Sequence, residues 1–185
     1  MTSYVMRRAA AEDLPAVMSL LDARTQWLRA RDTDQWSTRA FQPVMEGAIE
    51  RGETWLLCED GQAVATLTMN TTADPDFWTH DEQTTPAFYL SKLATSLDHK
   101  GRGLGALLID WAAGYACEHG ILWLRWDVWR TNVELQNYYR SIGATPLRVV
   151  NIPGRYSGAL FELSATPRAD LGITTIAHTE QLPQT

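Results

Sequence analysis

The chain has 185 residues, and its 22 acidic and 16 basic residues give it a formal net charge of −6. This length suffices for one domain with a substantial core. The acidic balance argues against a general affinity for nucleic acids or anionic membranes, because both require a basic face. It leaves room for a cationic, amine-bearing substrate. No apolar run approaches the ~20 residues of a membrane helix, and no secretory signal is visible, so we expect a cytoplasmic protein.

The chemistry-bearing residues Cys and His are few and scattered. Cys58 and Cys117 lack a C-x-x-C spacing, so we expect two free thiols in a reducing compartment. The four histidines, which have no metal-ligand spacing, are His80, His99, His119 and His178. We therefore expect no metal site.

Taken in chain order, the first half predicts a strand at Tyr4–Arg8 and then two helices. The first helix opens around Ala11–Pro15, with Asp13 as its N-cap, and the second spans Val44–Arg51. Strands are expected at 54–58 and 63–69, joined in a hairpin by the turn Glu59–Gln62.

The second half begins with a polar loop at 70–86 and a strand at 87–97. A long helix follows from Leu104 to near Gly120, then a strand at 121–129 and a helix that begins at Asn132. A last hairpin is expected from strands at 146–152 and 159–163. The tail from Thr166 is polar, and we expect it to be peripheral or partly disordered.

Between the strand at 87–97 and the long helix, three glycines alternate at Gly101, Gly103 and Gly105. Backbone N–H groups that open a helix lack partners, and the helix dipole adds a partial positive charge there. Glycines let such a backbone approach a ligand closely. With the cations Lys100 and Arg102, this run predicts a cradle for the phosphates of a nucleotide-like cofactor.

Several loops could account for the glycine run. A P-loop is set aside because no Lys-Ser or Lys-Thr follows a glycine here. A dinucleotide fingerprint lacks its third glycine, although Asp127 lies near the distance at which that motif expects an acid. A glycine-rich turn without a ligand is another alternative. The pattern of a basic or amide residue followed by x-x-G-x-G/A fits Lys100 to Gly105.

A second motif follows downstream, in which Asn132, Tyr139 and Gly143 keep the register N-x-x-A-x-x-x-Y-x-x-x-G-F. Leu135 replaces the Ala of that motif, and Ala144 replaces its Phe. On a helix, residues seven apart lie on one face, so Asn132 and Tyr139 should face the same way. With both motifs at this separation, the chain resembles the GNAT superfamily of N-acetyltransferases.

This resemblance implies an α/β fold with a mixed, mostly antiparallel central sheet flanked by helices, whose fourth and fifth strands splay apart. It implies one acetyltransferase domain over 1–165 and a polar tail over 166–185. Acetyl-CoA would be the cosubstrate, its pantetheine paired with the backbone of the fourth strand. The residues implied to bind it are Leu93, Ala94, Thr95, Lys100, Gly101, Arg102, Gly103, Leu104, Gly105, Ala106 and Asn132.

The reaction implied by the resemblance is direct attack of an amine on the thioester. Tyr139 is the candidate proton donor to the leaving thiolate, with Tyr138 as its rival. Asp127 is the candidate base, and a salt bridge with Arg125 or Arg130 is the alternative role for it. Asn132 could instead be a helix N-cap.

The acceptor is a primary amine of a small molecule in our leading interpretation. By the same resemblance, Trp27, Trp36 and Trp78 lie in segments that cover the acceptor site. Aromatic walls there would suit a flat or apolar molecule or an ammonium group, and core packing is the alternative for each. The competing hypotheses are an acetyltransferase of protein or peptide amines, a non-catalytic acyl-CoA-binding module and an NAD-type enzyme. Members of the superfamily often form homodimers, for which the last hairpin and the tail offer surfaces.

Overall fold

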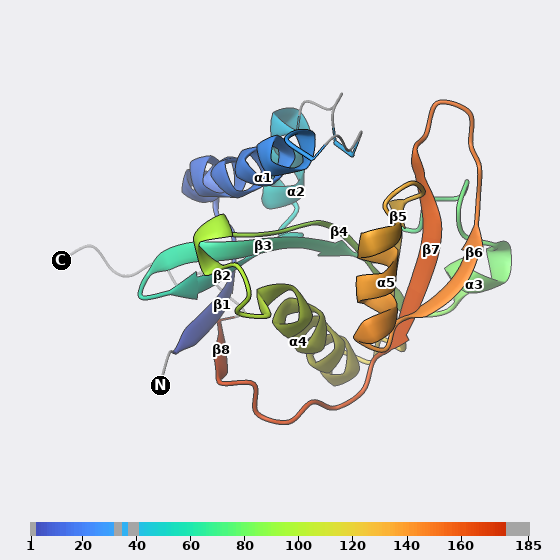
Figure 1. Cartoon of the computed structure of the whole chain (residues 1–185). Coiled ribbons are helices and arrows are strands. Elements are labelled where there is room, and N and C mark those ends of the chain that lie inside the picture. Colours follow the sequence, from blue (N-terminus) through green and yellow to red (C-terminus); the bar gives the residue numbers. More distant parts are fainter. Residues whose placement is uncertain (1–2, 32–34, 37–40, 177–185) are drawn as a thin grey trace.

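The computed structural model describes residues 3–31, 35–36 and 41–176. In this part of the chain eight strands form one sheet in the order β6-β7-β5-β4-β3-β2-β1-β8 (Figure 1). The strands are β1 (Tyr4–Arg8), β2 (Thr54–Glu59), β3 (Gln62–Asn70), β4 (Ala87–Thr95), β5 (Trp123–Trp129), β6 (Thr145–Val149), β7 (Ser157–Ser164) and β8 (Ile173–Ile176). Only β4 with β5 and β1 with β8 pair in parallel, so the expected mixed, mostly antiparallel sheet is confirmed.

Helices cover both faces of this sheet (Figure 1). They are α1 (Leu14–Arg29), α2 (Gln42–Glu50), α3 (His80–Thr84), α4 (Leu104–Glu118) and α5 (Val133–Ser141), with short 3-10 turns at Ala11–Asp13 and Leu97–His99. α1 and α2 lie on one face of the sheet, and α4 lies on the other. The apolar residues of α4 pack with Trp55, Trp126 and Phe161, while those of α1 and α2 form a second cluster around Leu56 and Ala94.

Local sequence signals account for most of these elements. The hairpin of β2 and β3 turns through Asp60 and Gly61, both with positive φ (49° and 79°), as a tight two-residue turn requires. α4 ends before Gly120, whose φ of 72° is the left-handed value common beyond a helix end. The hairpin of β6 and β7 is also confirmed.

Three features differ from the sequence-based expectations. Asp13 does occupy the N-cap position of α1, but its side chain makes no capping hydrogen bond, because its carboxylate accepts from the Ala10 N–H (2.8 Å) and pairs with Arg7 (2.6 Å). The loop expected at 70–86 contains the short helix α3. The segment beyond Thr166 supplies β8, a strand that no sequence pattern indicated.

Candidate active site

β4 and β5 are paired only where both strands begin, with Ala87–Tyr89 beside Trp123–Arg125. Beyond this point β4 continues along β3, and β5 continues along β7. A bulge in β4 places Lys92 and Leu93 opposite one residue of β3, and Lys92 adopts a φ of 52°. Because a bulge bends its strand, it turns β4 away from β5. The splay of the fourth and fifth strands is therefore present, and one edge of β4 is open.

The open edge presents backbone groups of Thr95. Thr95 lies opposite Ala65, and the N–H of Ser96 donates to the Val64 carbonyl at 2.8 Å. In an antiparallel ladder this register directs the N–H and C=O of Thr95 away from β3. Its carbonyl accepts from Nη2 of Arg24 at 2.9 Å. The Thr95 N–H thus faces the gap between the strands, where an added chain could pair with it.

The loop before α4 has the backbone of an anion cradle. Gly101 (φ 82°) and Gly103 (φ 70°) are both left-handed, and a Cβ on either would meet open space, so the backbone angle is what requires glycine. Helical bonding in α4 starts with Leu107 N–H to the Gly103 carbonyl. The N–H groups of Leu104–Ala106 therefore have no partner within the helix, and the helix dipole adds positive potential. This terminus fits a diphosphate.

Tyr138 of α5 lies over the same helix start. A Cβ placed on Gly105 would come within 3.0 Å of the Tyr138 hydroxyl, and the Ala106 N–H is directed at this oxygen. Burial raises the pKa of Tyr138, and the Ala106 contact lowers it in part. The structure thus places the hydroxyl of Tyr138 at the cradle, a location that the sequence pattern did not indicate.

The cations of the cradle loop have different environments. Arg102 donates to both carboxylate oxygens of Glu59 (2.6 and 2.8 Å) and to the Tyr4 hydroxyl (2.7 Å). His99 contacts the same carboxylate through Nε2 at 3.0 Å. Arg102 therefore fastens the loop to β1 and β2, and binding of a cofactor by its side chain stays a prediction. Lys100 is exposed.

Tyr139 is held in an aromatic cluster on α5, with 9% of its surface exposed. Its ring centroid lies 5.1 Å from that of Trp126 and 5.8 Å from that of Phe161. Burial, followed by the charges on Tyr138 and Asp127, raises the pKa of Tyr139 far above its usual value. The phenol therefore keeps its proton at neutral pH. Nε1 of the neighbouring Trp126 is buried without a hydrogen-bond partner in the described part of the chain.

Asp127 is half-buried on β5, where strand alternation directs it to the face opposite Trp126 and Val128. The alternative of a salt bridge is not found among the described residues. Arg125 contacts Glu162 and the Glu82 carbonyl. Arg130 donates to Asn151 and to backbone carbonyls of the β6–β7 loop. The carboxylate of Asp127 is thus left for another partner.

Asn132 is the N-cap of α5, since its Oδ1 accepts from the Leu135 N–H at 2.9 Å. Its Nδ2 donates to Oε1 of Gln35 at 2.6 Å. Gln35, which is only 8% exposed, links α5 to the segment between α1 and α2. The helix-cap role is confirmed, whereas contact of Asn132 with a coenzyme stays a prediction. No sequence pattern indicated Gln35.

The three tryptophans predicted to wall the acceptor site lie in different environments. Trp78 is 3% exposed and packs with Tyr89 at 5.4 Å between centroids. Trp36 is half-buried and packs edge-to-face against Phe41, with their ring centroids 5.3 Å apart. Trp27 is half-buried on α1, beneath the guanidinium groups of Arg24 and Arg31. Trp78 thus packs as a core residue in this structure, and the other two keep exposed surface.

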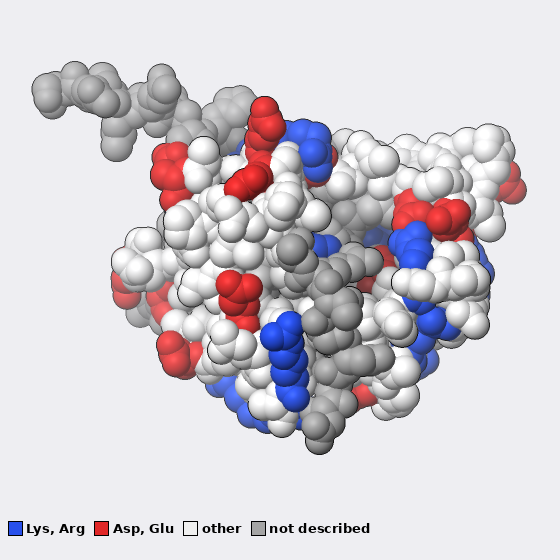
Figure 2. Space-filling model, turned by 90° about the horizontal axis from the view of Figure 1, so that it is seen from above, with Lys and Arg blue, Asp and Glu red and all other residues white. Residues whose placement is uncertain are grey.

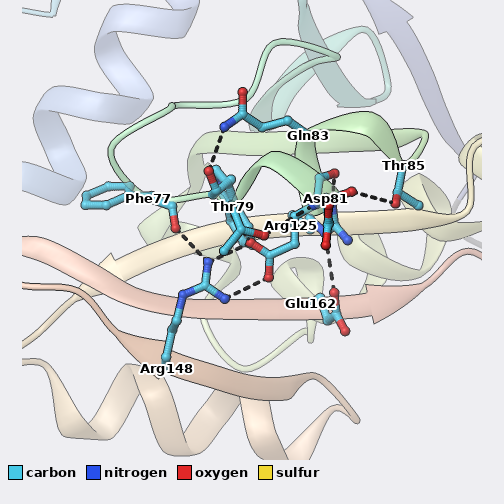
Figure 3. Close-up of polar contacts among 10 residues, drawn as sticks. Phe77, Thr79, Asp81, Gln83, Thr85, Arg125, Arg148 and Glu162 are labelled. Carbon is cyan, nitrogen blue, oxygen red and sulfur yellow. Dashed lines mark hydrogen bonds and ion pairs between the residues drawn. The ribbon is translucent and has the colours of Figure 1, made fainter.

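Two arginines, one from β5 and one from β6, bind the segment around α3 (Figure 3). Arg148 of β6 donates to both Glu82 carboxylate oxygens (2.6 and 2.7 Å) and to the Phe77 carbonyl (2.7 Å). Arg125 of β5 donates to the Glu82 carbonyl at 2.6 Å. These bonds form a clamp that joins the segment Phe77–Glu82 to β5 and β6.

The described part of the chain shows neither a cluster of metal ligands nor a membrane-spanning helix. No group of three or more His, Cys, Asp or Glu side chains converges as metal ligands would. None of the described helices has the length and apolar character needed to cross a membrane.

Comparison with models of protein families matches residues 21–144 to the acetyltransferase (GNAT) family. An uncharacterized N-acetyltransferase of Bacillus subtilis (strain 168), YesJ, is 29% identical over 147 residues, which are 73% of this chain and 78% of that protein. An S-alkylcysteine N-acetyltransferase of the same organism is 27% identical over 113 residues, 60% of each chain.

Solved structures share this fold. A GNAT-family acetyltransferase from Listeria monocytogenes 4b F2365 superposes with a TM-score of 0.75 at 23% identity, over 87% of this chain and 94% of that one. The ribosomal-protein-S18-alanine N-acetyltransferase from Escherichia coli gives a TM-score of 0.61 at 15% identity, over 90% and 97% of the two chains.

Proposed function

We propose, since the chain belongs to the acetyltransferase (GNAT) family, that it uses acetyl-CoA to acetylate a primary amine of a small molecule. The family and its named relatives make the chain an N-acetyltransferase. The donor and the acceptor class are the proposal. One observation carries it: the N–H groups that open α4 and the open edge of β4 are joined by a single short segment, Ser96–Gly103.

These two features fit the two ends of the coenzyme. The α4 terminus, with Gly103 at a φ of 70°, offers a diphosphate the N–H groups of Leu104 and Gly105, which have no partner within the helix. The Thr95 N–H offers a backbone partner to an amide of the pantetheine arm. When bound, acetyl-CoA supplies an activated thioester, whose carbonyl carbon is the electrophile.

The chain's own residues supply the proton chemistry. Tyr139 holds a proton on its phenol oxygen at neutral pH, as any tyrosine does, and a protonated phenol is the form that a general acid needs. Burial raises the pKa of Tyr139, which makes the phenol a weaker acid but keeps it neutral throughout the physiological pH range. Asp127 has no ion-pair partner among the described residues, so its carboxylate is free to take a proton from an incoming ammonium. An amine with a pKa of about 10.4 is almost fully protonated at neutral pH and needs such a base.

A small acceptor is supported by one of the relatives. The S-alkylcysteine N-acetyltransferase of Bacillus subtilis is named for a small amine, and it aligns with 60% of this chain. We infer that the acceptor here is likewise a small molecule rather than a protein.

The test is release of CoA from acetyl-CoA across a library of amino acids, polyamines, arylalkylamines and peptides. Isothermal titration with acetyl-CoA runs in parallel. We expect saturable binding and turnover of at least one small amine. Turnover of peptides alone would transfer the activity to the protein-acetylating class, and binding without turnover of any amine would support a non-catalytic module.

A further inference from the structure

Two arginines of the α1 end share one tryptophan. The Cζ atoms of Arg24 and Arg31 lie 5.0 and 3.6 Å from the ring centroid of Trp27. Arg24 also donates Nη2 to the carbonyl and the Oγ1 of Thr95, at 2.9 Å each. Among the described residues, no carboxylate pairs with either guanidinium. Arg7, by contrast, is paired in bidentate fashion with Asp13.

This arrangement is electrostatically incomplete. Arg24 is half-buried, and its pKa is lowered by burial first and by repulsion from Arg31 second. A bound anion would relieve both costs. The same charges make the Trp27 ring a poor cage for an ammonium group, because an incoming cation would be repelled. The surroundings of Trp27 therefore suit an anion better than the ammonium group expected there from the sequence.

The pair lies on the α1 side of β4, where Arg24 is bonded to Thr95. α1 covers the face of the sheet opposite α4, whose N-terminus forms the cradle (Figure 1). Figure 2 views the α1 face, on which basic and acidic side chains are interspersed. Thr95, to which Arg24 is bonded, is at the open edge of β4. An anion held here would enter from the α1 side, so we assign it to the acceptor and not to the coenzyme.

We propose that Arg24 and Arg31 bind a carboxylate of the acceptor, and that the substrates are therefore amino acids or their derivatives, with an amine and a carboxylate in one molecule. This proposal rests on the proposed N-acetyltransferase function. The planar guanidinium fork matches a carboxylate in geometry, and Trp27 beneath it holds both side chains in place.

The test compares each of leucine, phenylalanine and S-methylcysteine with its primary carboxamide. The carboxamide keeps the shape of the amino acid but lacks the negative charge of its carboxylate. Because its amine is less basic, more of it is neutral at pH 7, so this effect alone would make the carboxamide the better substrate. We expect the wild type to prefer the acids by about tenfold or more in kcat/KM. In the double variant Arg24→Gln/Arg31→Gln this preference should vanish, while the Kd for acetyl-CoA stays unchanged. Arg51→Gln, which removes an exposed cation of the α2 end, is the matched control and should keep the preference.

A readout independent of turnover is titration of the same variants with N-acetylleucine and N-acetylleucinamide. The wild type should bind the acid more tightly, and the double variant should bind both alike.

Equal use of acids and amides by the wild type would overturn the proposal. Weakened acetyl-CoA binding in the double variant would also overturn it, by assigning the pair to the coenzyme. Loss of the proposed function has a separate signature, the absence of acetyl-CoA binding by the wild type. The single variant Arg31→Gln, at an exposed position, serves if the double variant does not fold.

Discussion

Individual side chains divide the proposed chemistry between the two faces of the sheet. Tyr139 is buried with Trp126 on the α4 side, and this burial raises the pKa of its hydroxyl. Asp127, the next residue after Trp126, points to the opposite side and has no ion-pair partner in the described part of the chain. An acid and a base on opposite sides of β5 suit a reaction whose two substrates approach from different faces.

Removing the phenol hydroxyl tests the role of Tyr139. Tyr139→Phe keeps the ring in its aromatic cluster, so the fold and the Kd for acetyl-CoA should be little changed. We expect kcat to fall by about 10²–10⁴, the range of general acid catalysis. Tyr138→Phe is the control. The hydroxyl of Tyr138 contacts the Ala106 N–H at the start of α4 and is given no part in proton transfer, so this variant should largely keep kcat. The assignment fails if Tyr138→Phe is the variant that loses kcat.

A pair of glycines separates backbone strain from ligand binding. Gly103 and Gly120 have similar φ values (70° and 72°), and a Cβ on either would meet open space. Replacing each with Ala should lower the free energy of unfolding by about 1–2 kcal/mol, the cost of left-handed backbone for a residue with a Cβ. Only Gly103→Ala should also weaken acetyl-CoA binding. Denaturant unfolding and calorimetric titration measure both, and equal Kd values for the two variants would argue against the cradle.

At the level of elements, what could be predicted from the sequence depends on how local the signal is. The backbone of the loop before α4 could be predicted because the glycine spacing and the start of α4 lie within a few residues. α3 carried a local signal too, Thr79-x-x-Glu82, which forms a capping box in the structure. The contacts of Arg24 and Gln35 could not be predicted, because their partners Thr95 and Asn132 lie 71 and 97 residues away.

The clamp on α3 has a pH dependence of known sign. The pairing of Arg148 with Glu82 is the main cause that lowers the pKa of Glu82 from 4.5 to about 2. Because the folded value is the lower one, the pair stabilises the protein above about pH 4.5, and this contribution is lost as the pH falls toward 2. Glu82→Gln should cost about 1–2 kcal/mol at pH 7, allowing for solvent screening of a partly exposed pair. Urea unfolding should show the two proteins converging in acid, whereas a constant difference would contradict the pairing.

Across the whole molecule, β8 joins the ends of the chain. It pairs with β1 in parallel, and Thr175 accepts a hydrogen bond from Nε1 of Trp111 at 2.9 Å. Ile173 and Leu171 pack against the main core. The four residues Ile173–Ile176 follow a polar run and pair with a strand at the other end of the sequence, so no local periodicity could reveal them.

Deleting residues 166–185 tests whether the domain predicted at 1–165 folds alone. The deletion exposes the edge of β1 that pairs with β8, and it removes Leu171 and Ile173, which pack against the main core. We expect a folded, acetyl-CoA-binding protein whose unfolding free energy is lower by about 2–3 kcal/mol. Thr175→Val, which removes one hydrogen bond of β8, should cost only about 1 kcal/mol. A truncated chain that does not fold would place the boundary beyond β8.

The central claim, that the α4 terminus and the open edge of β4 hold acetyl-CoA, is tested most directly by titrating the labelled protein with acetyl-CoA and following backbone amide resonances. The largest shifts are expected for the N–H groups of Leu104–Ala106 and of Thr95. Shifts confined to other regions, with these amides unmoved at saturation, would contradict it.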